Sequence, residues 1–297
     1  MSGRVLAATI LSIATAFLYS LSNVLEMLEA EQVPDEYALR LGLMTRLIRR
    51  PRWLLGLLSD FFGFATQAAA LGLAAVVFVE PILSSGILMA IFLGAAFTHK
   101  PVHRSDIVAA LVLSAGLAVF LYEVSPTGGT AVGEIARWLV AGPIACAVIL
   151  GCMTIGRNTT GSWRGASLGL AAGISFGVAA VLTKTLMHYF GNGVFAWVNH
   201  WEPYALAVFA IGGVTLTQSA LQTGALSAAV GAQEAMAPIS AAIFGLVLLH
   251  EEVATQNGVQ IFFVSCSLVA VLVGIAMLAR AEERLMAEAA DEAWGVG

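Results

Sequence analysis

Apolar residues form stretches of about twenty along nearly the whole chain, and short polar segments separate these stretches. A helix that crosses a bilayer needs about 20 mainly apolar residues. Nine stretches come close to this length, at about residues 4–28, 54–73, 76–98, 105–122, 134–154, 164–188, 202–220, 225–248 and 257–279. The pattern therefore predicts an all-α integral membrane protein, with nine helices in a transmembrane bundle.

One block of this pattern occurs twice, because residues 66–119 and 217–270 align without a gap at an offset of 151. The matches that carry most weight are Thr66-Gln67 with Thr217-Gln218, Gly94 with Gly245, and His99 with His250. Equivalent helices lie five spans apart, and this odd number inverts the second copy in the membrane. Inverted repeats are typical of secondary transporters, so we expect a bundle built from two inverted repeats.

The polar segments divide the chain into four parts. We expect a first transmembrane repeat of four helices at 1–125, a linker plus the fifth helix at 126–158, a second inverted repeat of four helices at 159–280, and a polar, helix-prone cytoplasmic tail at 281–297. The acidic segment 29–36, after the first helix, is predicted to be a solvated loop or a short surface helix.

Composition supports the membrane assignment. Hydrophobic residues make up 59% of the chain and charged residues 11%, and the mean hydropathy is +0.88. A soluble domain carries about 25% charged residues, so a soluble class is excluded. The sequence has no basic patch of the kind that binds nucleic acid. It also has no GxSxG, HExxH, Walker or dinucleotide-binding motif, so we expect neither an enzyme nor a bound cofactor or metal.

Basic residues orient the predicted bundle. Three of them, Arg4, Arg137 and Lys184, fall on one side. The others share the opposite side: Arg40, Arg46, Arg49, Arg50, Arg52, Lys100, Arg104, Arg157, Arg164, Arg280 and Arg284. Because cytoplasmic loops carry the excess of lysine and arginine, we predict a multi-pass protein of the cell membrane with its N-terminus outside and its C-terminus in the cytoplasm.

The sixth predicted helix carries a glycine every four residues, at Gly165, Gly169, Gly173 and Gly177. Glycine at this spacing makes a flat groove that lets a neighbouring helix approach closely. We interpret the glycines as a helix-packing surface. A sliding surface for alternating access is an alternative that is compatible with packing.

Glu234 is the main candidate for chemistry inside the membrane. An ionisable side chain within a span is costly and therefore a functional candidate. Glu234 lies near the middle of its span and four residues before Pro238, and a proline frees a backbone carbonyl one turn earlier. We predict that Glu234 binds substrate or a coupling ion. The alternative is a structural acid that is hydrogen-bonded by Gln233, Gln218 or Thr217.

Four further polar residues are expected to line the same path: Glu80, Asp60, Gln67 and Gln218. Glu80 precedes a proline at the matching turn of the third helix. The two glutamines form the repeated pair, and we expect them to hydrogen-bond across helices or to contact substrate. Other ionisable residues near span ends are interpreted as solvated ends: Glu26, Lys184, His200, Glu202, His250, Glu251 and Glu252.

Residues 53–59 (Trp-Leu-Leu-Gly-Leu-Leu-Ser), followed by Gly63, Ala69-Ala70, Ala74, Val79 and Pro81, resemble the drug/metabolite transporter superfamily, in particular its EamA-like and NIPA-type magnesium-transporter branches. The second copy ends its third helix with Leu249-His250-Glu251-Glu252, similar to an acidic helix-end motif of EamA repeats. The resemblance covers roughly residues 53–120 and the second half more weakly. Phe64 stands where the NIPA-type pattern has a glutamate.

These features favour a secondary transporter that moves a small metabolite, a lipid-like solute or a cationic solute by alternating access. A NIPA-type transporter of magnesium or another divalent cation is one alternative, and a non-transporting scaffold or partner subunit is another. The expected partners are a small-molecule or ion substrate and the lipid bilayer. A homodimer is a further possibility, and no nucleic-acid partner is expected.

Overall fold

The computed structural model describes residues 3–73, 79, 82–83, 85–99, 101–124, 130, 132–191, 198–250 and 257–294. Its regular structure in these residues is helical, as the apolar pattern predicts. The elements are α1 (Gly3–Ala30), η1 (Asp35–Tyr37), α2 (Leu41–Leu47), α3 (Pro51–Leu73), α5 (Gly86–Thr98), α6 (Arg104–Val124), α7 (Ile135–Asn158), α8 (Gly161–Gly191), α9 (Glu202–Leu221), α10 (Leu226–Leu248) and α11 (Gly258–Trp294).

Seven helices within the described residues are long and apolar enough to cross a membrane. They cover Arg4–Ala30, Arg104–Val124, Ile135–Asn158, Gly161–Leu186, Glu202–Leu221, Leu226–Leu248 and Gly258–Leu285. All nine predicted stretches overlap a helix, but α3 and α5 are not among these seven. The described part of α5 has 13 residues, or about 20 Å at about 1.5 Å per residue. That length is short of the roughly 30 Å hydrocarbon layer, so a nine-span bundle stays a prediction.

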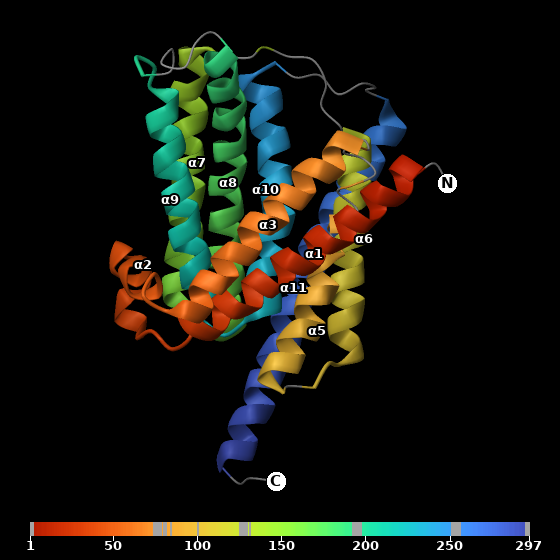
Figure 1. Cartoon of the computed structure of the whole chain (residues 1–297), viewed down its shortest axis with the longest axis vertical. Coiled ribbons are helices and arrows are strands. Elements are labelled where there is room, and N and C mark those ends of the chain that lie inside the picture. Colours follow the sequence, from red (N-terminus) through yellow and green to blue (C-terminus); the bar gives the residue numbers. More distant parts are fainter. Residues whose placement is uncertain are drawn as a thin grey trace.

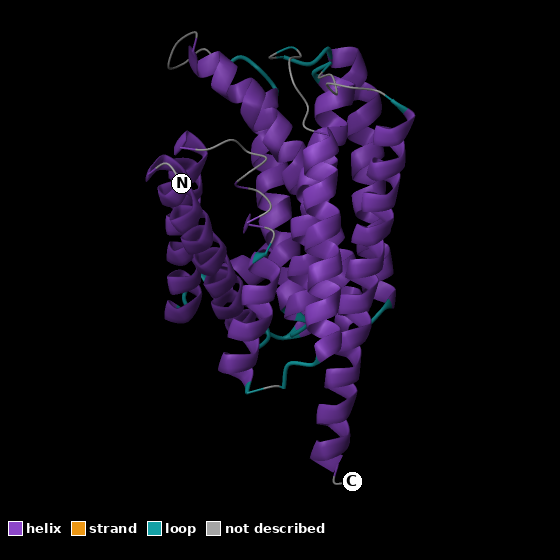
Figure 2. Cartoon of the chain, turned by 90° about the vertical axis from the view of Figure 1, so that its right-hand side faces the viewer, coloured by secondary structure: helices purple, strands orange, loops and turns teal. Residues whose placement is uncertain are grey.

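The helices pack in two sets (Figure 1). In the first half, α1 packs on α3 and α5; in the second half, α8 packs on α9 and α10. The two halves also meet through α6 and α11, while α7 lies against α8. In Figure 1, α7, α8, α9 and α10 stand side by side, and α1 and α3 cross in front at an angle. Figure 2 shows the C-terminal end of α11 projecting beyond the other helices.

α8 lies at the centre of its set. In the most apolar 18-residue stretch of α8, 78% of the residues are buried inside the bundle, compared with 17% for α7 and 28% for α11. The outer helices turn large apolar side chains outward, including Leu139, Val208 and Phe262. Such a surface is unfavourable in water and favourable in lipid. The distribution of apolar side chains is therefore that of a membrane-embedded bundle.

The predicted glycine groove of α8 lies against α10. A Cβ atom on Gly169 would overlap the carbonyl oxygen of Ala229, and one on Gly177 would come within 2.7 Å of the amide nitrogen of Ala241. Ser240 of α10 donates a hydrogen bond to the carbonyl of Gly173 at 3.1 Å. A side chain larger than hydrogen at these positions would force the two backbones apart.

The segment after α1 is more ordered and more buried than the sequence suggests. Helix α1 continues to Ala30, and η1 and α2 follow it. Gln222 at the end of α9 donates a hydrogen bond to the carbonyl of Val33 at 2.6 Å, and Leu43 and Leu47 of α2 are fully buried. Most of 29–36 is exposed and η1 begins at Asp35, in line with the expected solvated loop or short surface helix, whereas Val33 is buried and packs with the apolar side chains of α2.

The loops gather at two ends of the bundle. At one end, Arg164 at the start of α8 pairs with Asp35 at 3.2 Å, and Trp163 donates a hydrogen bond to Glu283 of the tail at 3.0 Å. These contacts bring the segment after α1, the start of α8 and the tail together. At the other end, the amide of Thr130 donates a hydrogen bond to the carbonyl of Leu249 at 2.6 Å.

Candidate functional site

A cavity with polar and apolar lining lies between α1, α3, α5, α6, α8, α9 and α10. It consists of two chambers of about 250 Å³ and 500 Å³. The chambers adjoin, because both are lined by Tyr19, Asn23, Phe176, Gln233 and Glu234. Pockets that hold small molecules have volumes of about 300–1,000 Å³, so the two chambers together are large enough for a small solute.

The cavity brings together four of the five residues that the sequence predicts to line a path. Asp60, Gln218 and Glu234 line the smaller chamber, and Gln67 and Glu234 line the larger one. Glu80 lies outside the described residues. Residues that are far apart in the sequence therefore meet around one space.

Glu234 lies where the two chambers join, and its side chain is exposed to that space. Pro238, one turn further along α10, lines the larger chamber. A proline cannot donate the backbone hydrogen bond to the residue four positions earlier. The backbone carbonyl of Glu234 therefore lacks the helical hydrogen bond from residue 238, as the sequence argument expects.

Glu26 is a cavity residue that the sequence argument misses. The interpretation as a solvated helix end is wrong, because Glu26 is only 7% exposed and lines the smaller chamber. A signal is present in the sequence, since Tyr19, Asn23 and Glu26 lie at positions i, i+4 and i+7 of one apolar helix. That spacing puts three polar side chains on one face of α1, which is the face that lines the cavity.

A hydrogen-bond network fixes the wall beside Glu26. The indole nitrogen of Trp53 donates to Oε1 of Gln218 at 3.0 Å. Nε2 of Gln218 donates to Oε2 of Glu26 at 2.5 Å. The hydroxyl of Ser22 donates to the carbonyl of Gly56 at 2.7 Å and lies 3.3 Å from Oε1 of Glu26. Three helices, α1, α3 and α9, are joined by this network.

In both copies of the repeated Thr-Gln pair, side chains form hydrogen bonds with other helices. In the first copy, Tyr19 donates to Oε1 of Gln67 at 2.7 Å. In the second copy, Gln218 bonds Glu26, as described above, and Thr217 donates to Oε1 of Gln233 on α10 at 2.6 Å. The hydrogen bonding across helices that the sequence predicts for the two glutamines is present in the structure.

The charge of the cavity wall has one sign. Three carboxyl groups line the chambers, those of Glu26, Asp60 and Glu234, and no lysine or arginine of the described residues does so. Aromatic rings complete the wall: Tyr19, Trp53, Phe64 and Phe176. Carboxylates and aromatic faces both attract cations, so the wall favours a positively charged solute over an anion.

The cavity has an apolar extension along α3. Leu54, Leu58 and Phe61 line a neighbouring pocket that shares Tyr19 and Asp60 with the smaller chamber. The exposed side chains of these three residues lie on the outer surface of the bundle. Polar cavity and apolar outer surface are therefore adjacent at Asp60.

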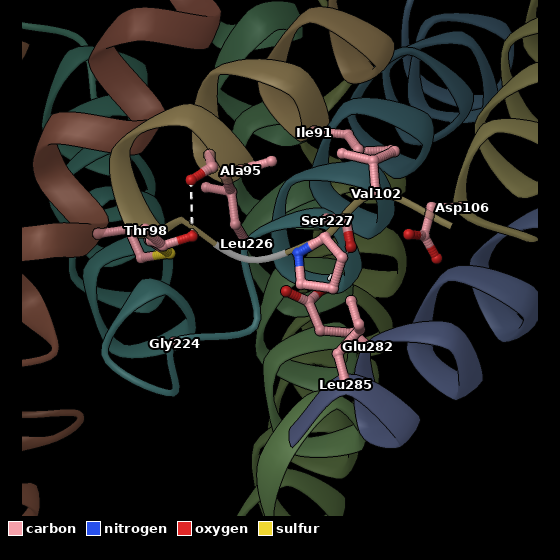
Figure 3. Close-up of a pocket in the computed structure, with 13 residues that line it drawn as sticks. Ile91, Ala95, Thr98, Val102, Asp106, Gly224, Leu226, Ser227, Glu282 and Leu285 are labelled. Carbon is pink, nitrogen blue, oxygen red and sulfur yellow. Dashed lines mark hydrogen bonds between the residues drawn. The ribbon is translucent and has the colours of Figure 1, made fainter. Parts of the chain in front are cut away.

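A second, smaller pocket lies at the end of the bundle near the tail (Figure 3). Its volume is about 50 Å³, enough for one or two water molecules at roughly 30 Å³ each. Here Glu282 of α11 accepts hydrogen bonds from the hydroxyl of Ser227 and, at 3.1 Å, from the amide of Ala228. Glu282 thus caps the first turn of α10, which is a structural role. Among the described residues, no group of three or more His, Cys, Asp or Glu side chains could hold a metal ion.

The chain is similar to an uncharacterized protein of Corynebacterium glutamicum, with 24% identity over 248 residues that cover 83% of this chain and 86% of that protein. No protein-family model matches the chain. No solved structure matches it either. Fold and site together define a multi-pass helical membrane protein with an acidic cavity inside the bundle.

Proposed function

We propose that this protein is a secondary transporter that moves a small cationic solute across the cell membrane by alternating access. The observation that carries the proposal is the cavity with three carboxyl groups, Glu26, Asp60 and Glu234, inside a bundle of apolar helices. Keeping such groups within a membrane is costly. A non-transporting scaffold has no need of them, whereas a transporter of cations does.

The helix arrangement supports alternating access. α1 packs on α3 and α5, and α8 packs on α9 and α10. Each set contains the start of one repeated sequence block. Two inverted repeats around a central site are the basis of rocking motions in many transporters. The distribution of basic residues supports an orientation with the tail in the cytoplasm.

The aromatic content of the wall favours an organic cation over a magnesium ion. Phe64 lines the larger chamber, at the position where the resembling magnesium-transporter pattern has a glutamate. Magnesium requires oxygen ligands in near-octahedral geometry. An ammonium group instead gains from aromatic faces by about 0.5–2 kcal/mol each.

Transport by purified protein in liposomes tests the proposal, with tetramethylammonium as the probe. We expect uptake by the wild type and at least a tenfold loss in Glu234→Gln, because the variant removes the charge where the chambers join. Glu134→Gln is the matched control, since Glu134 forms an exposed ion pair with Arg137 at the start of α7. A panel that includes choline and Mg²⁺ widens the test. Flux of Mg²⁺ alone, or equal flux in wild type and Glu234→Gln, would contradict the proposal.

A further inference from the structure

Glu26 is a buried carboxyl group with no basic side chain of the described residues in its chamber. It is 7% exposed, and the charged groups that line the chamber from neighbouring helices are the acids Asp60 on α3 and Glu234 on α10. The groups that line the chamber from α8 and α9 are uncharged. Arg50, at the same end of the bundle, pairs with Glu29 at 2.9 Å. A buried carboxylate that lacks a cation is strongly disfavoured, and such a group takes up a proton instead.

The first part of the hydrogen-bond network shows what Oε2 of Glu26 does. The indole N–H of Trp53 can only donate, so the atom of Gln218 that faces it at 3.0 Å must be the carbonyl oxygen. The orientation of the amide is then determined, and its NH₂ group faces Oε2 of Glu26. Oε2 is therefore the acceptor oxygen of the carboxyl group.

The second part shows what faces Oε1 of Glu26. A serine hydroxyl has one hydrogen, and that of Ser22 points to the carbonyl of Gly56 at 2.7 Å, which can only accept. Oε1 of Glu26 lies 3.3 Å from the same hydroxyl oxygen. A hydroxyl bond to an ionised carboxylate would be the shorter of the two, at about 2.5–2.7 Å. At 3.3 Å the contact is long for an O–H···O hydrogen bond in either direction, so Ser22 gives an ionised Oε1 little stabilisation.

We propose that Glu26 is a proton-binding site of the transport cycle, neutral in this conformation and able to release its proton into the adjoining chamber. The transport role rests on the proposed function, whereas the protonation does not. On release, the hydrogen on Oε1 passes to a water molecule in the chamber, and Glu26 becomes a carboxylate. One proton leaves and one monovalent cation can take its place, so the charge of the wall is balanced without oxidation or reduction.

Gly56 makes this site sterically possible. A Cβ atom there would lie 2.9 Å from Cγ of Glu26 and 3.2 Å from the carbonyl oxygen of Ser22. Only a glycine lets α3 approach closely enough for its carbonyl to accept the hydrogen of Ser22. The carbonyl of Gly56 therefore accepts the hydrogen bond of Ser22, which leaves Oε1 of Glu26 with only the long 3.3 Å contact.

Infrared difference spectroscopy of the full-length protein in liposomes at pH 7 tests the proposal without a transport assay. We expect the wild type to show a carboxylic-acid C=O stretching band that Glu26→Gln loses. Glu29→Gln, one turn further along α1, is the matched control. Glu29 forms an ion pair with Arg50, so its replacement should remove carboxylate bands and leave the acid band in place.

Ser22→Ala provides a second variant in which the acid itself is unchanged. We expect its acid band to be retained, because the hydroxyl of Ser22 bonds the carbonyl of Gly56 rather than Glu26. An ionised Glu26, seen as loss of carboxylate bands in Glu26→Gln, would overturn the proposal. If the acid band is present but no tested cation crosses the membrane, the proton site stands and the transport function fails.

Discussion

Helix α10 meets α8 on one face and the cavity on another, and the two faces differ in what fills the space. Towards α8, the contact is made by backbone atoms and small side chains such as Ala229 and Ser240, set against the glycines of α8. Towards the cavity, α10 presents Gln233 and Glu234. Close approach leaves no room for water or solute, whereas larger polar side chains hold the helices apart. One helix therefore forms both a close contact with no room for water, the dry face, and a wall of the cavity.

Substitution at the dry face should have the largest effect on stability. In Gly169→Ala, the new methyl group would overlap the carbonyl of Ala229, and neither backbone can move without separating the helices. We expect the free energy of unfolding in detergent to fall by about 3 kcal/mol, measured by thermal or denaturant unfolding.

Gly151→Ala on α7 is the control, because no other helix lies within 4 Å of the position that a Cβ atom on Gly151 would take. Alanine is the better helix former by about 0.5–1 kcal/mol, so this variant should be unchanged or slightly more stable. Equal losses in both variants would show that close packing is not what makes Gly169 necessary.

Substitution in the polar part of the cavity wall should have the next largest effect on stability. Gln218→Leu removes the hydrogen-bond partner that the indole N–H of Trp53 and the carboxyl group of Glu26 share. A buried polar group that loses its hydrogen bond costs about 1–3 kcal/mol, so we expect a loss of about 2 kcal/mol. Thr215→Val on the same helix is the control. Its hydroxyl bonds the carbonyl of Ile211 within α9, and the expected change is within about 0.5 kcal/mol.

Substitution at the end of the bundle near the tail should have the smallest effect on stability. Arg164 and Asp35 form an ion pair at 3.2 Å, but the side chain of Asp35 is 74% exposed. Exposed pairs contribute about 0–1 kcal/mol, so Asp35→Asn should lower stability by less than about 1 kcal/mol. High salt should abolish the difference from wild type. A loss that persists in high salt would point to a packing role for the segment after α1.

Local patterns anticipate much of the fold and part of the site. All nine predicted stretches overlap helices, because the length of an apolar run is a local property. Glu234 with Pro238, and the paired glutamines, are found for the same reason. Burial of Val33 and α2 after α1 is missed, since it depends on their contacts with α9. Glu26 is misjudged because its depth is counted along α1, whereas its surroundings come from two other helices.

By itself, the sequence determined that this protein is a bundle of apolar helices in a membrane, with few acids inside the spans. Those properties follow from composition and from the spacing of residues along single helices. Only the tertiary structure decided which polar side chains share one cavity and which face of α10 is dry. Glu26 and Gln218 are separated by 192 residues, and no local pattern carries that contact. It depends on how closely α1, α3 and α9 approach, which the packing of the whole bundle sets.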